Sequence, residues 1–148
     1  MSHKDSFKKR NKSFTAENKC VEFLNNNNIL YTRYGFDALF DIPWQKFNMI
    51  PEKLRCTPDY MILHTKATLL EVKGCSNILR LKQLDMEAYD FWASMVELNM
   101  FIYSTLNRTH KIINYAKLKS IAVNCETDMY PENKKVYYRI PWELIDAK

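Results

Sequence analysis

The chain has little glycine and no long apolar run. It contains only two glycines and five prolines in 148 residues, which excludes a low-complexity chain. No apolar run approaches the ~18 residues that a membrane-spanning helix requires. The lysine-rich start also lacks the apolar core of a signal peptide. We therefore expect no membrane contact and one ordinary domain, whose core is filled by the 47% of residues that are hydrophobic.

Cysteine and histidine patterns typical of metal or disulfide sites are missing as well. The four cysteines show no paired spacing, so they indicate neither a zinc knuckle nor a disulfide framework. The three histidines do not cluster, and no glycine-rich phosphate loop is present, so we expect no nucleotide cofactor. Reduced thiols fit an intracellular protein, either cytoplasmic or nucleoid-associated.

The charge is basic, with a formal net value of +5. This balance suits an anionic partner such as DNA, although a surface that only keeps the protein soluble fits equally well. Residues 1–12 are polar and predict a flexible basic arm, followed by a single domain over residues 13–148. Lys8, Lys9, Arg10 and Lys12 in this arm are candidate contacts for nucleic-acid phosphates, or else parts of a solubilising tail.

A predicted hairpin lies at the centre of the chain. Two apolar runs flank a short polar break at residues 64–67, which is typical of two antiparallel strands. Because side chains alternate along a strand, Glu71 and Lys73 share one face. A loop of Thr65–Ala67 would place Asp59 opposite Lys73, with the Cβ atoms of Asp59 and Glu71 diagonal neighbours roughly 7 Å apart.

Two carboxylates at this separation repel each other, and a hard divalent cation relieves the conflict. Mg²⁺ takes oxygen ligands and keeps several waters, and Mn²⁺ is expected to substitute for it. Asp59 and Glu71 would hold the ion, with the Val72 carbonyl as an extra ligand. Lys73 is expected on a solvent-facing site, where it orients a water or stabilises the phosphate. The pattern therefore predicts metal-assisted phosphodiester hydrolysis, whereas each piece alone also fits an ordinary turn or a solvated ion pair.

The same residues carry a resemblance to a known group. Thr57-Pro58-Asp59-Tyr60 and Glu71-Val72-Lys73-Gly74 resemble the central motif of the PD-(D/E)xK nuclease superfamily, most closely the phage endonuclease I Holliday-junction resolvases. Ala16-Glu17-Asn18-Lys19 is similar to that family's first-helix acidic motif, and Arg139-Ile140-Pro141-Trp142 to its closing strand. The resemblance implies a restriction-endonuclease-like core, a homodimer and a metal site completed by Glu17, and it is compatible with a phage-encoded protein. From the residues alone, Glu17 also fits a role as a partner of the helix dipole.

The remaining patterns give a coarse order of elements. We predict strands at 29–36, 100–104 and 136–140, and helices at 15–25, 77–96 and 141–144. Arg80 and Lys82 near the start of the second helix are candidate phosphate contacts, or else a solvated helix face. The long connection over 37–56 is either a substrate loop or a strand with an excursion. This order favours an α/β fold with a mixed central sheet flanked by helices.

The sequence therefore predicts a Mg²⁺-dependent deoxyribonuclease that cuts branched DNA. One alternative is a nuclease of the same fold that acts on ordinary duplex or single-stranded DNA. Another is a non-catalytic nucleic-acid-binding module. An intact Asp59, Glu71 and Lys73 set argues against this last class, because a pure binder has no use for two anions facing a polyanion.

Overall fold

The computed structural model describes residues 3–35 and 43–145, with the backbone alone described for residues 3–14 and for Trp44. Its elements, in chain order, are α1 (His3–Asn26), β1 (Tyr31–Arg33), α2 (Trp44–Phe47), α3 (Glu52–Arg55), β2 (Tyr60–Leu63), β3 (Ala67–Cys75), β4 (Ile78–Lys82), α4 (Gln83–Ala93), β5 (Leu98–Ser104), β6 (Thr109–Asn114), α5 (Tyr115–Ala122), β7 (Thr127–Met129), β8 (Val136–Pro141) and the 3₁₀ helix η1 (Trp142–Leu144).

The strands form two sheets. The larger has the order β1-β2-β3-β5-β6, with β3 and β5 parallel and every other neighbouring pair antiparallel. The smaller has the antiparallel order β4-β8-β7. The prediction of an α/β fold with a mixed central sheet flanked by helices is confirmed.

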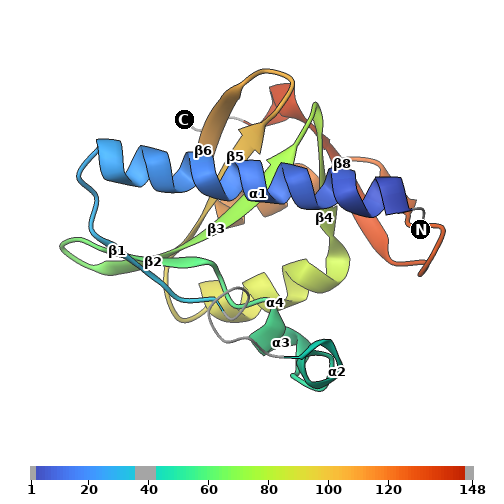
Figure 1. The fold of residues 1–148 in the computed structure, drawn as a ribbon, viewed down its shortest axis with the longest axis horizontal. Coiled ribbons are helices and arrows are strands. Elements are labelled where there is room, and N and C mark those ends of the chain that lie inside the picture. The colour runs from blue at the N-terminus through green and yellow to red at the C-terminus, as the bar shows by residue number, and fades with distance from the viewer. Residues whose placement is uncertain (1–2, 36–42, 146–148) are drawn as a thin grey trace.

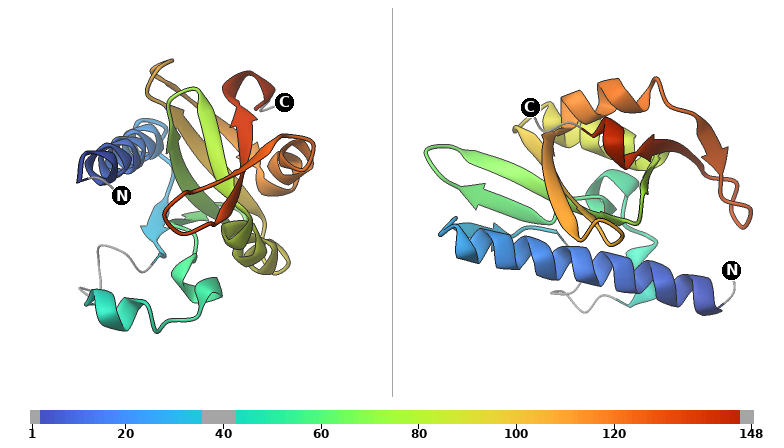
Figure 2. Two further views of the ribbon diagram at one scale, coloured as in Figure 1. Left: turned by 90° about the vertical axis from the view of Figure 1, so that its right-hand side faces the viewer. Right: turned by 90° about the horizontal axis from the view of Figure 1, so that it is seen from above.

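The central sheet is buried on both faces. Helix α1 crosses one face, whereas α4 and α5 lie on the other (Figures 1 and 2). On β3, Leu70 and Val72 belong to the core beneath α1, and Leu69 and Cys75 belong to the core on the α4 side. Because β3 alternates regularly, the side chains of Glu71 and Lys73 lie on the α4 side of the sheet.

Helix α1 corrects the prediction of a flexible basic arm. The helix begins at His3 and continues without a break to Asn26, so it starts twelve residues before the predicted start at residue 15. No glycine or proline interrupts this segment, and lysine and arginine are good helix formers. In its C-terminal half the helix buries Ala16, Cys20 and Leu24 at four-residue spacing.

Strand β4 corrects the prediction of a helix over 77–96. Residues 78–82 are extended, with Leu79 and Leu81 buried and Arg80 exposed between them, and the helix starts only at Gln83. The apolar residues alternate with cationic ones, which is a period of two, and this local signal agrees with a strand. Arg80 and Lys82 therefore lie on a strand beside β8.

The other elements follow the sequence more closely. Strands β5 and β8 and the turn of helix after Pro141 are where they were predicted, whereas β1 is limited to Tyr31–Arg33. The long connection contains two single-turn helices, α2 and α3, in its described part. Residues 36–42 of that connection lie outside the described residues. Among the described helices, none combines the length and apolar character needed to cross a bilayer.

Candidate active site

The β2–β3 hairpin sets the positions of the predicted metal ligands. The register pairs Met61 with Leu69 and Leu63 with Ala67, so the loop is formed by residues 64–66. The loop predicted at 65–67 was wrong by one residue at each end. This error shifts the partner of Asp59 on β3 by two residues, from the predicted Lys73 to Glu71. Extending the observed register by one residue places Asp59 directly opposite Glu71, closer than the predicted diagonal arrangement.

Backbone contacts fix Asp59 at the mouth of this hairpin. The Val72 amide donates a 2.8 Å hydrogen bond to Oδ2 of Asp59. The Asp59 carbonyl accepts hydrogen bonds from the amides of Tyr34 and Gly35, at 2.9 and 3.2 Å. A Cβ atom at Gly35 would lie 3.2 Å from the Thr57 carbonyl oxygen, so glycine permits this close approach.

The carboxylate of Glu71 is enclosed on the α4 side of the sheet. The Tyr89 hydroxyl donates a 2.7 Å hydrogen bond to its Oε1 atom, and Lys73 Nζ lies 3.1 Å from the same oxygen. Lys73 Nζ is also 3.9 Å from Oδ2 of Asp85. The Lys73 side chain is only 25% exposed, so the expectation of a solvent-facing lysine was wrong. It lies over the ring of Tyr89, which shields it from water.

These side chains line a polar pocket of about 170 Å³. Strand β3, the preceding loops and helix α4 all contribute to its wall. The lining residues are Gly35, Arg55, Cys56, Thr57, Asp59, Glu71, Lys73, Asp85 and Tyr89. The structure thus brings Asp59, Glu71 and Lys73 into one pocket.

The electrostatics of the pocket favour added positive charge. Burial raises the pKa of Asp59 well above its ordinary value, and the nearby Glu71 carboxylate raises it further. Burial would lower the pKa of Lys73, but Tyr89, Glu71 and Asp85 outweigh that effect and raise it well above its ordinary value. Lys73 is therefore a permanent cation, while Asp59 resists carrying a second negative charge beside Glu71.

The donor set fits a hard divalent ion. Asp59 and Glu71 offer carboxylate oxygens, the ligands that Mg²⁺ and Mn²⁺ prefer. In a strand the amide and carbonyl of one residue point to the same side. Because the Val72 amide points to Asp59, the Val72 carbonyl also points to that side of β3. Burial first, and then the neighbouring Glu71, raise the pKa of Asp59, and a bound cation would oppose both effects.

Glu17 reaches this group only indirectly. It lies on α1, which covers the opposite face of the sheet, and it is not among the residues that line the pocket. Arg33 stands between the two acids, with its guanidinium 3.9 Å from Oε2 of Glu17 and 3.8 Å from Oδ1 of Asp59. The guanidinium also donates a 3.2 Å hydrogen bond to the Tyr60 hydroxyl. The structure therefore connects Glu17 to Asp59 through an arginine.

Several residues of the pocket were missed from the sequence. Asp85 and Tyr89 are four residues apart on α4 and so share one helix face, next to Lys73. That spacing of an acid and a hydroxyl was the available signal. Arg33 had no local signal, because its role depends on β1 lying beside β2.

A second cluster of potential ligands lies along the same pocket wall. Ligand atoms of Glu52, Cys56 and Asp85 lie within 4.8 Å of one another. Burial raises the pKa of the Cys56 thiol to about 12, with Asp85 and Glu52 adding to the rise. The thiol therefore keeps its proton near neutral pH and lies 3.6 Å from Oδ1 of Asp85, within reach of a weak hydrogen bond. A protonated thiol is a poor ligand, so this group suits Mg²⁺ less well than Asp59 and Glu71 do.

Of the predicted nucleic-acid contacts, Lys8, Lys9, Arg10 and Lys12 fall in the N-terminal half of α1, where only the backbone is described.

Comparison with protein-family models found no matching family, and comparison with curated proteins found no match either. The chemistry of the pocket is therefore argued from its geometry.

Proposed function

We propose that the protein is a metal-dependent DNA endonuclease that hydrolyses phosphodiester bonds. The observation that carries the proposal is the convergence of Asp59, Glu71 and Lys73 in one small polar pocket at the end of the hairpin. A buried acid, Glu71, and a largely buried one, Asp59, beside a permanent cation match the needs of a reaction that moves negative charge onto phosphate oxygens. The mixed sheet flanked by helices supports a restriction-endonuclease-like core of the PD-(D/E)xK type.

In this proposal, Asp59, Glu71 and the Val72 carbonyl hold a Mg²⁺ ion, and Mn²⁺ can replace it. When bound, such an ion lowers the pKa of a coordinated water and neutralises charge that develops on the phosphate. The protein's own contribution is to preorganise the ligands. The Val72 amide orients Asp59, and the Tyr89 hydroxyl orients Glu71.

Lys73 acts as a fixed positive charge. Its raised pKa keeps it protonated at neutral pH, so it cannot take a proton from water. It can instead donate hydrogen bonds to the attacking water and to the phosphate oxygens, which gain charge in the transition state. Glu71 and Asp85 hold the ammonium group in place, at 3.1 and 3.9 Å.

Glu17 is proposed to act through Arg33. The arginine lies near both Glu17 and Asp59, so Glu17 competes with Asp59 for its positive charge. Drawing Arg33 toward Glu17 leaves Asp59 free to serve as a ligand, and Glu17 thereby extends the metal site without lining the pocket.

The proposed substrate is branched DNA, and the proposed assembly is a homodimer. Resolving a four-way junction needs two symmetric cuts, and a two-fold dimer presents two sites with that symmetry. The chain contributes one such pocket in its described part. The basic residues Lys8, Lys9, Arg10 and Lys12 would lie along the DNA backbone on α1.

The test is a cleavage gel that compares a four-way junction, a matched duplex and a single strand, with Mg²⁺, Mn²⁺ or chelator. We expect metal-dependent cuts in the junction, and none from the variants Asp59→Asn and Glu71→Gln. Cutting of all three substrates alike would favour the same-fold nuclease of ordinary DNA. Binding without any cutting by the wild type would leave only the non-catalytic binding module. Light scattering of the same samples reports whether the protein is a dimer.

A further inference from the structure

The second sheet has a face that its strand pattern makes cationic. Leu79 and Leu81 on β4 are buried in the core, so Arg80 and Lys82 lie on the opposite face of the sheet. The register pairs Arg80 with Arg139 of β8, and cross-strand partners share a face. We call Arg80, Lys82 and Arg139 the cationic face.

This arrangement is unfavourable for the protein alone. Like charges directly opposite each other on neighbouring strands destabilise a sheet. In the described parts of the chain, no ion pair joins a carboxylate to any of the three residues of the cationic face. Among the described residues, the three cations of this face therefore lack an ion-paired acid, and an anionic partner would compensate their charge.

Two tyrosines orient these cations without neutralising them. The Arg80 guanidinium lies 5.3 Å from the ring centre of Tyr137 and 5.9 Å from that of Tyr130, and Lys82 Nζ lies 5.6 Å from the Tyr130 ring centre. The two rings pack 4.5 Å apart and are buried, so they support the cations and are not stacking platforms for bases. The register also places Asp128 on this face, and extending it by one residue places Glu126 opposite Arg139, whose amide donates a 2.8 Å hydrogen bond to the Glu126 carbonyl. Among the described residues, neither carboxylate forms an ion pair with Arg139.

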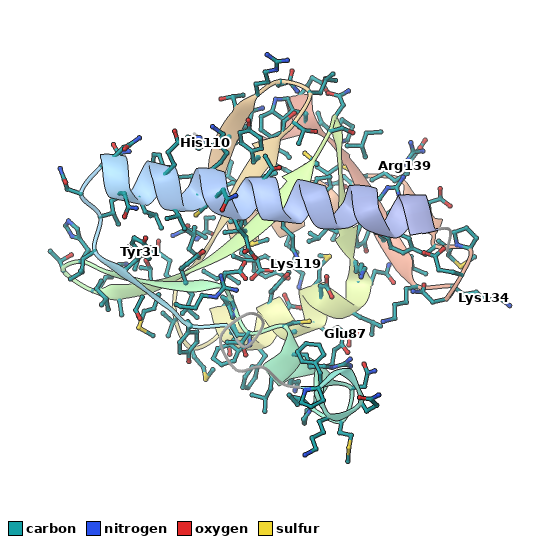
Figure 3. The ribbon with its side chains drawn as sticks, in the orientation of Figure 1. Tyr31, Glu87, His110, Lys119, Lys134 and Arg139 are labelled. Atoms are coloured by element: carbon teal, nitrogen blue, oxygen red, sulfur yellow. The ribbon has the colours of Figure 1, made fainter. Side chains whose placement is uncertain are left out.

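The cationic face adjoins the pocket. Lys82 directly precedes α4, whose first turn holds the pocket residue Asp85. The N-terminal half of α1, with its basic residues 8–12, passes on the same side of the small sheet as this face, whereas α5 lies on the other side (Figures 1 and 2). Figure 3 shows Arg139 at the end of the molecule where α1 begins.

We propose that the cationic face binds the phosphate backbone of DNA next to the bond that the pocket cuts. The choice of DNA as the polyanion rests on the proposed function. The contact is sequence-independent, because exposed or half-buried guanidinium and ammonium groups meet phosphate oxygens, and the described rings beside them, Tyr130 and Tyr137, are buried.

The test measures binding of fluorescent duplex DNA by anisotropy in chelator, across a salt series. The variant is Arg80→Gln with Arg139→Gln, and the matched control is Arg108→Gln with Lys117→Gln, which removes two charges from the β5–β6 turn and from α5. Each phosphate contact contributes about 0.9 to the slope of log affinity against log salt. We expect the variant's slope to fall by about 1.8, with the control unchanged. Equal slopes for the variant and the control would overturn the proposal.

Thermal melting separates this role from a structural one. Removing two facing arginines should leave the melting temperature unchanged or raise it, because it relieves repulsion. If that variant melts lower, the substitution Arg80→Lys with Arg139→Lys keeps both charges and should retain the wild-type salt slope. If the double lysine variant shows the same reduced salt slope as the double glutamine variant, the positive charge of these residues is not what binds DNA.

The two proposals fail in different ways. A wild-type protein that binds DNA through this face but never cuts it would refute the endonuclease and leave the cationic face standing. A protein that cuts with Mg²⁺, and whose glutamine variant binds DNA with the wild-type slope, would refute the cationic face alone.

Discussion

The Tyr89 hydroxyl donates a 2.7 Å hydrogen bond to Oε1 of Glu71, and this bond joins helix α4 to strand β3 at the pocket. The same carboxylate oxygen lies 3.1 Å from Lys73 Nζ. Tyr89 thus holds the acid from the helix side, while Asp59 approaches it from the hairpin side. Burial, with Glu71 next to the ring, raises the pKa of Tyr89 well above its ordinary value, so the hydroxyl keeps its proton and remains a donor.

Tyr89→Phe should reduce cleavage and stability together. The variant removes one partner of a buried carboxylate, which costs about 1–3 kcal/mol of unfolding free energy. Tyr115→Phe is the matched control, because its hydroxyl bonds to Asp90 and to the Met86 carbonyl, outside the pocket. We expect both variants to lose stability and only Tyr89→Phe to lose affinity for Mn²⁺ in calorimetric titration. Equal Mn²⁺ affinities would show that Tyr89 is only a packing residue.

Lys73→Gln should abolish most of the cleavage. Losing a charged contact to the transition state costs about 10²–10³ in rate. Lys66→Gln is the control, since Lys66 lies on the hairpin loop and pairs with the exposed Glu97. Single-turnover cleavage measures the rate, and circular dichroism checks the fold. A folded Lys73→Gln protein that cuts at the wild-type rate would remove Lys73 from the mechanism.

The stability of the metal-free protein should depend on pH through Asp59. Its folded pKa is raised above the ordinary value of 3.8, so the folded protein binds a proton that the unfolded chain releases. This contribution is fully present below pH 3.8 and is lost as the pH rises through the folded pKa. Asp59→Asn should therefore remove the fall in unfolding free energy that the wild type shows as the pH rises from 3.8 through the folded pKa of Asp59. The variant should also melt at a higher temperature at neutral pH. Mg²⁺ should stabilise the wild type but not the variant.

Melting curves in chelator across this pH range check the Asp59 prediction, with Asp128→Asn as an exposed control. A wild-type and an Asp59→Asn protein with parallel curves would mean that Asp59 does not carry the pH dependence.

Glu17→Gln should reduce cleavage strongly and stability little. Because α1 begins at His3, Glu17 lies outside its first turn and the helix dipole no longer explains it. If Glu17 is only a structural partner of Arg33, the change costs at most ~1 kcal/mol of stability and leaves cutting intact. Glu22→Gln on the same helix is the control, because Glu22 pairs with the exposed Lys19. If Glu17 acts through Arg33, then Arg33→Gln together with Glu17→Gln should cut no worse than Glu17→Gln alone. A further loss in the double variant would mean that the two residues act independently.

The sequence predicted the site better than its surroundings, for physical reasons. Both the predicted and the observed hairpin loops have three residues, so the rule of alternation put Asp59 and Glu71 on one face either way. The exact loop was missed because the polar residues 64–67 accept the turn at either position. The sequence could not give the distances in and around the pocket, since Tyr89 in its wall and Arg33 beside Asp59 belong to a helix and a strand remote in sequence from the hairpin.

The wrong predictions of local structure concern residues 1–12 and residues 77–96. The lysine-rich composition of residues 1–12 predicts an arm, but no glycine or proline interrupts α1 there. The helix predicted over 77–96 starts only at Gln83, and the apolar residues Leu84, Phe91 and Met95 of that range are exposed. Its buried face instead contains Met86 and Tyr89.

Strands β3 and β4 follow each other with only Ser76 and Asn77 between them. Glu71 and Lys73 of the pocket and Arg80 and Lys82 of the cationic face therefore belong to one short, nearly continuous stretch of extended chain. Hydrogen bonds hold this junction, since the Asn77 carbonyl accepts from the Trp142 amide at 2.9 Å and the Cys75 carbonyl from the Thr105 amide at 2.8 Å. The distance along the chain from Lys73 in the pocket to Arg80 on the cationic face is thus fixed by a few residues. Because side chains alternate along a strand, a single residue inserted there would turn Arg80 toward the core.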